Sequence, residues 1–128
     1  SFANIGLIPD SGGTWTLPRI AGQARALGMA LTAEPVTAER AESWGLIWKC
    51  VDDDKLMDEA NALVSKFAAA PTPGLAATKK LTRARARHGF DQQLDIERDT
   101  QRRLGRTHDY SEGVAAFGEK RAPKFTGN

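Results

Sequence analysis

The feature that most constrains this chain is the break Pro9-Asp10-Ser11-Gly12-Gly13, which follows the apolar run of residues 5–8. Pro9 fixes its own φ, and the two glycines have no Cβ, so the backbone can turn tightly and a ligand can approach it closely. Asp10 is the only acidic side chain in this stretch. We therefore expect Asp10 to lie at the mouth of a site rather than on a smooth surface.

Composition excludes several classes of protein. The chain has 128 residues, of which 41% are hydrophobic and 27% charged, as in ordinary globular proteins. With 18 basic and 16 acidic residues, its net charge of +2 calls for no polyanionic partner. The single cysteine excludes an internal disulfide framework.

No signal peptide and no stretch of membrane-spanning length is present, so we expect a cytoplasmic protein that binds no membrane. The start at Ser1, without Met, suggests a piece of a longer chain.

The first seventy residues are predicted to mix helix and strand. Apolar residues recur at spacings of three and four over residues 15–31, which predicts two short helices with Pro18 and Gly22 at the break. Thr37 suits the start of a third helix, and Gly45 its end. The apolar residues 46–51 that follow predict a strand.

The remainder of the chain is predicted to be helical. Residues 56–67 follow the helical period, and Pro71-Thr72-Pro73-Gly74 should interrupt any regular element. Further helices are predicted over residues 75–88 and 90–104, with a last short one around residues 111–117. The fold class is thus α/β, with a boundary between residues 1–70 and residues 71–128.

Asp10 has two interpretations on local pattern alone. A carboxylate just before a small-residue helix entry can cap the helix by accepting backbone N–H groups. Alternatively, apolar surroundings desolvate the carboxylate and make it a stronger base, suited to moving a proton.

Other residues with chemical potential favour structural roles. His88 and His108 are isolated from further ligands and should be solvated, so we expect no metal site. Cys50 lacks an activating partner and is expected to be a small core residue. Trp44 and Trp48 are expected to fill the core.

A basic run over residues 79–87 could bind nucleic acid, but acidic residues follow it at once. We expect these carboxylates to pair with the arginines of the run and to leave a solvated or interface face without nucleic acid. The carboxylates are Asp91, Asp95, Glu97 and Asp99.

A second candidate binding site lies near the end of the chain. Lys120 and Arg121 follow Phe117, a combination of cations and an aromatic ring that suits a phosphate beside an adenine. The same residues could equally form a solvated tail.

Together these motifs resemble the enoyl-CoA hydratase/isomerase family, also called crotonases. The resemblance rests on residues 5–15, on Leu17-Pro18-Arg19, on residues 38–51 and on residues 112–121, and it covers essentially the whole chain. It implies that residues 1–70 form the C-terminal part of a crotonase-like ββα-spiral core. Residues 71–128 would form a helical oligomerisation region that packs between the subunits of a trimer, or of a dimer of trimers.

The resemblance also suggests a reaction. Family members that hydrate a double bond resemble one another in carrying two glutamates, one upstream of this chain and one at the position of Phe2. Asp10 stands where those hydratases usually have glycine, as in isomerases of the family. Finer similarity, over residues 9–15, 44–48, 93–99 and 125–127, is to members that isomerise a ring epoxide of phenylacetyl-CoA. Hydration, a Δ3,Δ2-enoyl-CoA isomerisation and a non-catalytic assembly module remain as alternatives.

By resemblance, Asp10 would be the proton shuttle, and Phe117 and Lys120 would contact coenzyme A. Coenzyme A would be part of the substrate, and no tightly bound cofactor is expected. The backbone donors that stabilise the thioester oxygen would come from outside this chain.

Overall fold

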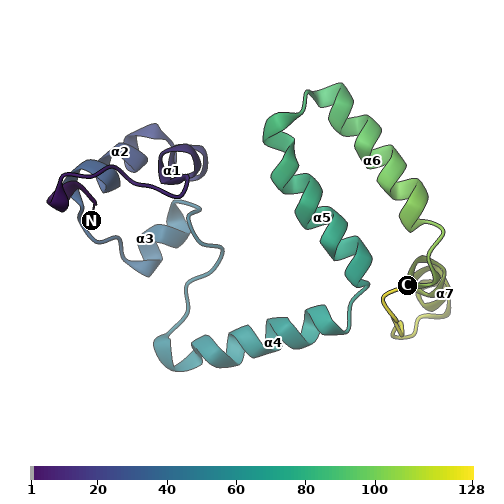
Figure 1. Ribbon diagram of the computed structural model, residues 1–128. Coiled ribbons are helices and arrows are strands. Elements are labelled where there is room, and N and C mark those ends of the chain that lie inside the picture. Colours follow the sequence, from purple (N-terminus) through teal and green to yellow (C-terminus); the bar gives the residue numbers. More distant parts are fainter. Residues whose placement is uncertain (1) are drawn as a thin grey trace. The chain divides into compact units, whose positions relative to one another are not determined.

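The computed structural model describes residues 2–128, without the side chain of Arg85. It divides into two compact units, residues up to Leu56 and Met57–Asn128. Each unit is described by itself. Throughout residues 2–128 the regular elements are helices (Figure 1).

The first unit is built on a pair of packed helices. Helix α1 (Gly13–Ala21) and helix α2 (Gln23–Thr32) lie side by side (Figure 1), and the short 3-10 helix η1 (Phe2–Ile5) packs on α2. Gly22 separates them with a φ of +85°, a conformation that favours glycine. The two predicted helices are confirmed, but Pro18 lies inside α1, so Gly22 alone makes the break.

Helix α3 (Ala38–Ser43) follows the sequence prediction at both ends. The Thr37 hydroxyl accepts the backbone N–H of Arg40 at 3.4 Å, and Gly45 has a φ of +75° just after the helix. A side-chain acceptor at the first position and a left-handed residue after the last are common ways of ending a helix.

The strand predicted over residues 46–51 is wrong. The backbone N–H groups of Leu46 and Ile47 both donate to the Ala41 carbonyl, at 2.8 and 3.4 Å, so they close helix α3 instead of pairing with another strand. The 3-10 helix η2 (Asp53–Lys55) then leads into α4. Because residues 2–128 contain no strand, the α/β class and the spiral layers are not seen here.

The second unit contains most of α4 (Leu56–Ala68), followed by α5 (Thr72–Ala84), the 3-10 helix η3 (Arg85–Arg87), α6 (Phe90–Leu104) and α7 (His108–Glu119). Helices α5 and α6 run antiparallel and contact each other (Figure 1). The helices predicted over residues 56–67 and 90–104 are confirmed.

Pro71 and the residues after it begin a helix instead of interrupting one. The Pro71 carbonyl accepts the N–H groups of Gly74 and Leu75, at 3.0 and 3.2 Å. Pro73 lies in the first turn of α5, where a missing N–H costs no hydrogen bond. The predicted boundary between residues 70 and 71 therefore falls at a helix start. As a border between family regions it stays a prediction.

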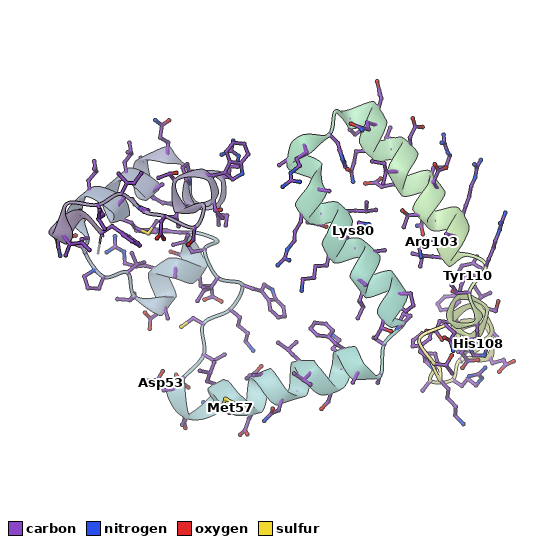
Figure 2. All side chains as sticks on the ribbon, in the orientation of Figure 1. Asp53, Met57, Lys80, Arg103, His108 and Tyr110 are labelled. Atoms are coloured by element: carbon purple, nitrogen blue, oxygen red, sulfur yellow. The ribbon has the colours of Figure 1, made fainter. Side chains whose placement is uncertain are left out.

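Burial in this chain is confined to small side chains. The buried apolar residues among those described are Ala21, Ala26, Ala77 and Ala116. Many large apolar side chains are exposed, as Met57 is at 65% (Figure 2), and others, such as Leu17 and Leu104, are half-buried. The helices are thus held by local packing and hydrogen bonds, with much apolar area left uncovered.

Candidate functional site

Asp10 begins a tight turn that leads into α1. Its carbonyl accepts the N–H of Gly13 at 2.7 Å, and the two residues between them, Ser11 and Gly12, have φ values of 51° and 83°. Two successive left-handed residues are characteristic of a type I′ turn. The turn is crowded, since a Cβ on Gly13 would lie 3.0 Å from that of Pro9.

The carboxylate of Asp10 does not cap the helix. The capping position of α1 is Gly12, and no side chain accepts a hydrogen bond there. Asp10 is exposed, and its carboxylate forms no hydrogen bond or ion pair with the other described residues. The helix-cap interpretation is therefore wrong, and the carboxylate is available to a ligand.

Asp10 lines a cavity of about 440 Å³ in the first unit. Phe2 lines the same cavity, so the two positions that the family resemblance singled out lie in one site. The other lining residues are uncharged: Pro9, Ser11, Gly13, Thr16, Leu17, Met29 and Ala30. Among the described residues this cavity therefore has one carboxylate in mostly apolar walls.

Phe117 and Lys120 lie in the second unit, at the end of α7. The Phe117 ring is 87% exposed, and the Lys120 N–H donates to the Phe117 carbonyl at 3.3 Å. Lys120 has a φ of 56° and ends the helix in the left-handed conformation. Within residues 2–128 its ammonium group makes no ion pair or hydrogen bond. An exposed ring and an unpaired cation thus lie three positions apart at the end of α7, while Arg121, the other cation of the predicted patch, is paired with Glu112 and Glu119.

Glu112 organises the segment after Lys120. Its two oxygens accept Nη1 and Nη2 of Arg121 at 2.6 and 2.9 Å, a bidentate pair, and Oε1 also accepts the N–H of Lys124 at 2.7 Å. Arg121 and then the Lys124 N–H lower the pKa of Glu112 to about 2. Arg121 Nε also donates to Glu119 at 2.6 Å.

Asp109 holds the end of the chain in a similar way. Its carboxylate, only 3% exposed, accepts the N–H groups of Thr126 and Gly127 at 2.7 and 2.9 Å. The Thr126 N–H is the main reason that the pKa of Asp109 lies below its usual value. His108 Nδ1 adds contacts to Thr126 Oγ1 at 3.3 Å and Asp109 Oδ1 at 3.5 Å.

Sequence reasoning missed both carboxylates. Asp109 and Glu112 are three residues apart and so share one face of α7. That spacing, together with the basic tail that follows, was the sequence signal that could have identified these two carboxylates as partners of the tail. We call residues 121–128, which these two carboxylates hold, the C-terminal strap.

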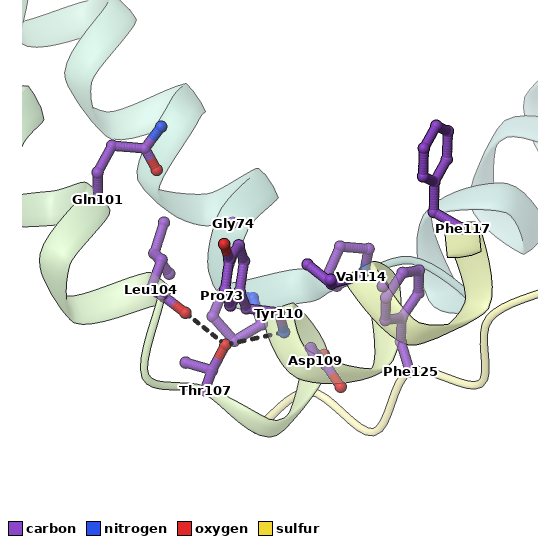
Figure 3. A pocket seen from close by; sticks show the side chains of 13 residues that line it. Pro73, Gly74, Gln101, Leu104, Thr107, Asp109, Tyr110, Val114, Phe117 and Phe125 are labelled. Atoms are coloured by element: carbon purple, nitrogen blue, oxygen red, sulfur yellow. Dashed lines mark hydrogen bonds between the residues drawn. The ribbon is translucent and has the colours of Figure 1, made fainter. Parts of the chain in front are cut away.

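The strap borders a larger cavity of about 630 Å³ (Figure 3). Phe125 of the strap and Phe117 of α7 both line it, together with Leu104 of α6. At its edge the Thr107 hydroxyl donates to the Leu104 carbonyl at 2.7 Å and accepts the Tyr110 N–H at 3.2 Å. The cavity is mostly apolar, with polar groups from Gln101, Thr107, Asp109 and Tyr110.

The remaining candidate residues have structural surroundings. His88 Nδ1 contacts Gln93 Oε1 at 3.0 Å. Cys50 is half-buried outside any strand, and burial raises the pKa of its thiol, which disfavours the nucleophilic thiolate. Trp44 is half-buried, with the Arg40 guanidinium 4.7 Å from its ring centre. Trp48 is 76% exposed, so the prediction that it fills the core is wrong.

The acidic residues after the basic run pair within their own helix. Arg98 contacts Asp95 at 2.8 Å and Asp99 at 3.2 Å, and Arg102 contacts Asp99 at 3.7 Å. These partners are one or three positions apart on α6, so each pair lies within that helix. The expected pairs with the arginines of residues 79–87 are therefore not formed among the side chains described.

Two kinds of feature are absent from the described residues. The His, Cys, Asp and Glu side chains described form no group of three or more that could hold a metal ion. None of the helices has both the length and the apolar character needed to cross a bilayer.

Comparison with known proteins identifies the family. A model of the enoyl-CoA hydratase/isomerase family matches residues 1–128. The 1,2-epoxyphenylacetyl-CoA isomerase of Escherichia coli K12 is 51% identical, over 99% of this chain and 48% of its own length. A Rhodobacter capsulatus protein assigned to the enoyl-CoA hydratases is 46% identical, over 99% of this chain and 49% of its own.

Solved structures agree with the sequence matches. An enoyl-CoA hydratase/isomerase from Mycobacterium abscessus superposes with a TM-score of 0.93 at 36% identity, over 99% of this chain and 49% of that one. The chain thus spans about half the length of the curated relatives it matches. On these matches and on its own motifs, the chain belongs to the enoyl-CoA hydratase/isomerase family.

Proposed function

We propose that this chain forms part of an isomerase of acyl-CoA thioesters in which Asp10 carries the proton. The observation behind the proposal is the cavity that Asp10 and Phe2 share, with Asp10 as its single carboxylate among the described residues. Hydration of a double bond needs one group to activate water and another to protonate carbon. One carboxylate is enough to move a proton between two carbons.

The proposed step follows from the acidity of a thioester. Asp10 takes a proton from the carbon beside the thioester carbonyl, and the electron pair moves onto the carbonyl oxygen as an enolate. The same carboxyl group, now protonated, returns the proton two carbons further on, and the double bond shifts. The donors that hold the enolate oxygen lie outside this chain.

The finer proposal concerns the acyl group. Identity of 51% to the Escherichia coli isomerase favours 2-(1,2-epoxy-1,2-dihydrophenyl)acetyl-CoA as the substrate. Rearrangement of that epoxide to an oxepin needs a polarised carbonyl and a shaped pocket, and Asp10 would serve the accompanying double-bond shift. A Δ3,Δ2-enoyl-CoA isomerisation uses the same proton transfer.

Coenzyme A contacts and assembly complete the proposal. We place Phe117 and Lys120 against the adenine and phosphate part of coenzyme A, because the ring is exposed and the ammonium group has no partner in residues 2–128. Residues 71–128 would serve as a trimerisation region and residues 1–70 as part of the spiral core. The uncovered apolar side chains are consistent with burial between subunits.

The test uses the full-length protein that contains this chain. Asp10→Asn should lower kcat for isomerisation by about 10²- to 10⁴-fold and leave the affinity for the CoA ester unchanged. Asp54→Asn, which removes an exposed carboxylate away from the cavity, should change neither. Full isomerase activity in Asp10→Asn would refute the assignment.

Hydration is the second candidate, because the Rhodobacter capsulatus relative is assigned to the hydratases. Adding a short-chain 2-enoyl-CoA to the unmodified protein separates the two. Water addition by the unmodified protein that persists in Asp10→Asn would favour the hydratase. No water addition by the unmodified protein would favour the isomerase.

A further inference from the structure

Arg121 binds two carboxylates of α7. Its guanidinium takes both oxygens of Glu112 and, through Nε, one oxygen of Glu119. Lys120 is the neighbouring residue, and its ammonium group is left without a partner among the described residues. The two adjacent cations are therefore used differently: Arg121 is fixed within the chain and Lys120 is free to meet an anion.

Backbone hydrogen bonds at Lys120 and Arg121 hold Lys120 in a left-handed conformation. The Arg121 N–H donates to the Ala116 carbonyl at 3.0 Å and the Lys120 N–H to the Phe117 carbonyl at 3.3 Å, while Lys120 has a φ of 56°. A left-handed conformation is unfavourable for a residue with a Cβ. The bidentate pair from Arg121 to Glu112, two turns earlier on α7, supplies an anchor immediately after this residue.

Glu112 is well placed to hold Arg121 and the strap. Its side chain is only 15% exposed, and it holds the strap at a second point, the N–H of Lys124. A bidentate carboxylate–guanidinium contact fixes direction as well as distance, which a single contact with a lysine cannot do.

We propose that Glu112, acting through Arg121, is a positioning residue that sets Lys120 beside Phe117 for binding the phosphorylated adenosine of coenzyme A. This inference rests on the proposed coenzyme A contact of Lys120 and Phe117. It adds that the contact depends on a carboxylate which does not itself touch the ligand.

The experiment compares two substrates in the full-length protein that contains this chain. One is the CoA thioester, and the other is the pantetheine thioester of the same acyl group, which lacks the phosphorylated adenosine. Glu112→Gln should raise KM for the CoA thioester by up to about fivefold, as for the weakening of a partly exposed charge pair. Its kcat and its KM for the pantetheine thioester should stay unchanged, and this also shows that the variant is folded.

Two further variants refine the test. Arg121→Lys keeps the charge but loses the bidentate contact, so it should raise KM for the CoA thioester to a similar extent as Glu112→Gln. Asp109→Asn loosens the far end of the strap without touching the Glu112–Arg121 pair. It should leave the ratio of the two KM values unchanged.

The outcomes distinguish this inference from the proposed function. If Lys120→Ala changes neither KM, the coenzyme A contact is wrong and the positioning role is wrong with it. If Lys120→Ala raises KM for the CoA thioester alone and Glu112→Gln does not, the contact stands and the positioning role is refuted. Equal rises for both substrates in Glu112→Gln would also refute it, because the damage would then be general.

Discussion

The buried carboxylate of Asp109 accepts the backbone N–H of Gly127 at 2.9 Å, across eighteen positions of the chain. Gly127 has a φ of +82°, and a Cβ there would lie 3.1 Å from the Thr72 hydroxyl at the start of α5. The strap thus runs from the end of α7 to the beginning of α5. The relationship joins elements that are distant in sequence.

Acid should release the strap. The folded state lowers the pKa of Glu112 from 4.5 to about 2, and that of Asp109 from 3.8 in the same direction. A lowered pKa stabilises the folded state above the unfolded pKa, and this contribution is lost as the pH falls through the folded value. Hydrogen exchange at the amides of Lys124 and Thr126 should therefore accelerate as the pH falls from 4.5 towards 2, after correction for intrinsic rates.

The matched variant for that prediction is Glu112→Gln. It should increase exchange at Lys124 already at neutral pH and remove the part of the pH dependence that Glu112 causes. Exchange that stays independent of pH in the unmodified protein between pH 4.5 and 2 would contradict the prediction.

Gly113 of α7 lies against the ring of Phe125. A Cβ at Gly113 would lie 3.6 Å from Phe125 Cε1, which is ordinary contact. Gly113→Ala should therefore stabilise the protein by about 0.5–1 kcal/mol, the usual gain from removing a helical glycine. Gly113→Leu should instead displace the ring and cost about 1–3 kcal/mol.

Thermal unfolding measures both effects, with Gly118 as the control. A Cβ at Gly118, in the same helix, meets no atom within 4 Å. Gly118→Leu should therefore cause no comparable loss, and a loss equal to that of Gly113→Leu would show that Phe125 is not the cause.

The turn at Gly12 should be sensitive to any side chain. Its φ of 83° is left-handed, so Gly12→Ala should cost about 1–2 kcal/mol and lower kcat by shifting Asp10. Gly28→Ala is the matched control, since Gly28 lies within α2 and a Cβ there meets no neighbour. In urea unfolding, Gly12→Ala should lower the stability and Gly28→Ala should raise it. In the isomerase assay, only Gly12→Ala should lower kcat. Equal stability of the two variants would count against the strained turn.

Thr107 links α6 to α7 through both functions of its hydroxyl. Thr107→Ala loses the bond to the Leu104 carbonyl as well as the helix cap, and should cost about 1–2 kcal/mol, whereas Thr107→Ser should be nearly neutral. Thr37→Ala removes only the longer cap of α3, at 3.4 Å, and should cost less. Chemical denaturation gives the order, and an equal loss in Thr37→Ala would contradict it.

The helices could be predicted because their signals are local. Thr37 and Gly45 bound α3, and glycines 89 and 105 bound α6, each acting within a few residues. A strand cannot be predicted in this way, because its hydrogen bonds need a partner. The Leu46 N–H donates to the Ala41 carbonyl instead, so the predicted strand is wrong, and no strand of the α/β class is seen among the residues described.

The candidate site was predictable to a similar extent. The turn at Asp10 follows from proline and glycine geometry, but its meeting with Phe2 depended on the family resemblance. The strap could not be predicted, because Asp109 meets Thr126 seventeen positions later and no periodicity reports such a contact. Whether Asp10, Phe117 and Lys120 act as proposed stays a prediction.

The buried apolar residues described are all alanines, which changes what a mutational scan of the large apolar residues would measure. Shortening a large apolar side chain normally measures packing within the chain that carries it. Here Ala21, Ala26, Ala77 and Ala116 are the buried apolar residues among those described, and the large side chains face outwards. A stability loss on replacing Leu31 or Val64 by alanine would therefore measure contacts made beyond this chain's own helices, and such a scan would map where they lie.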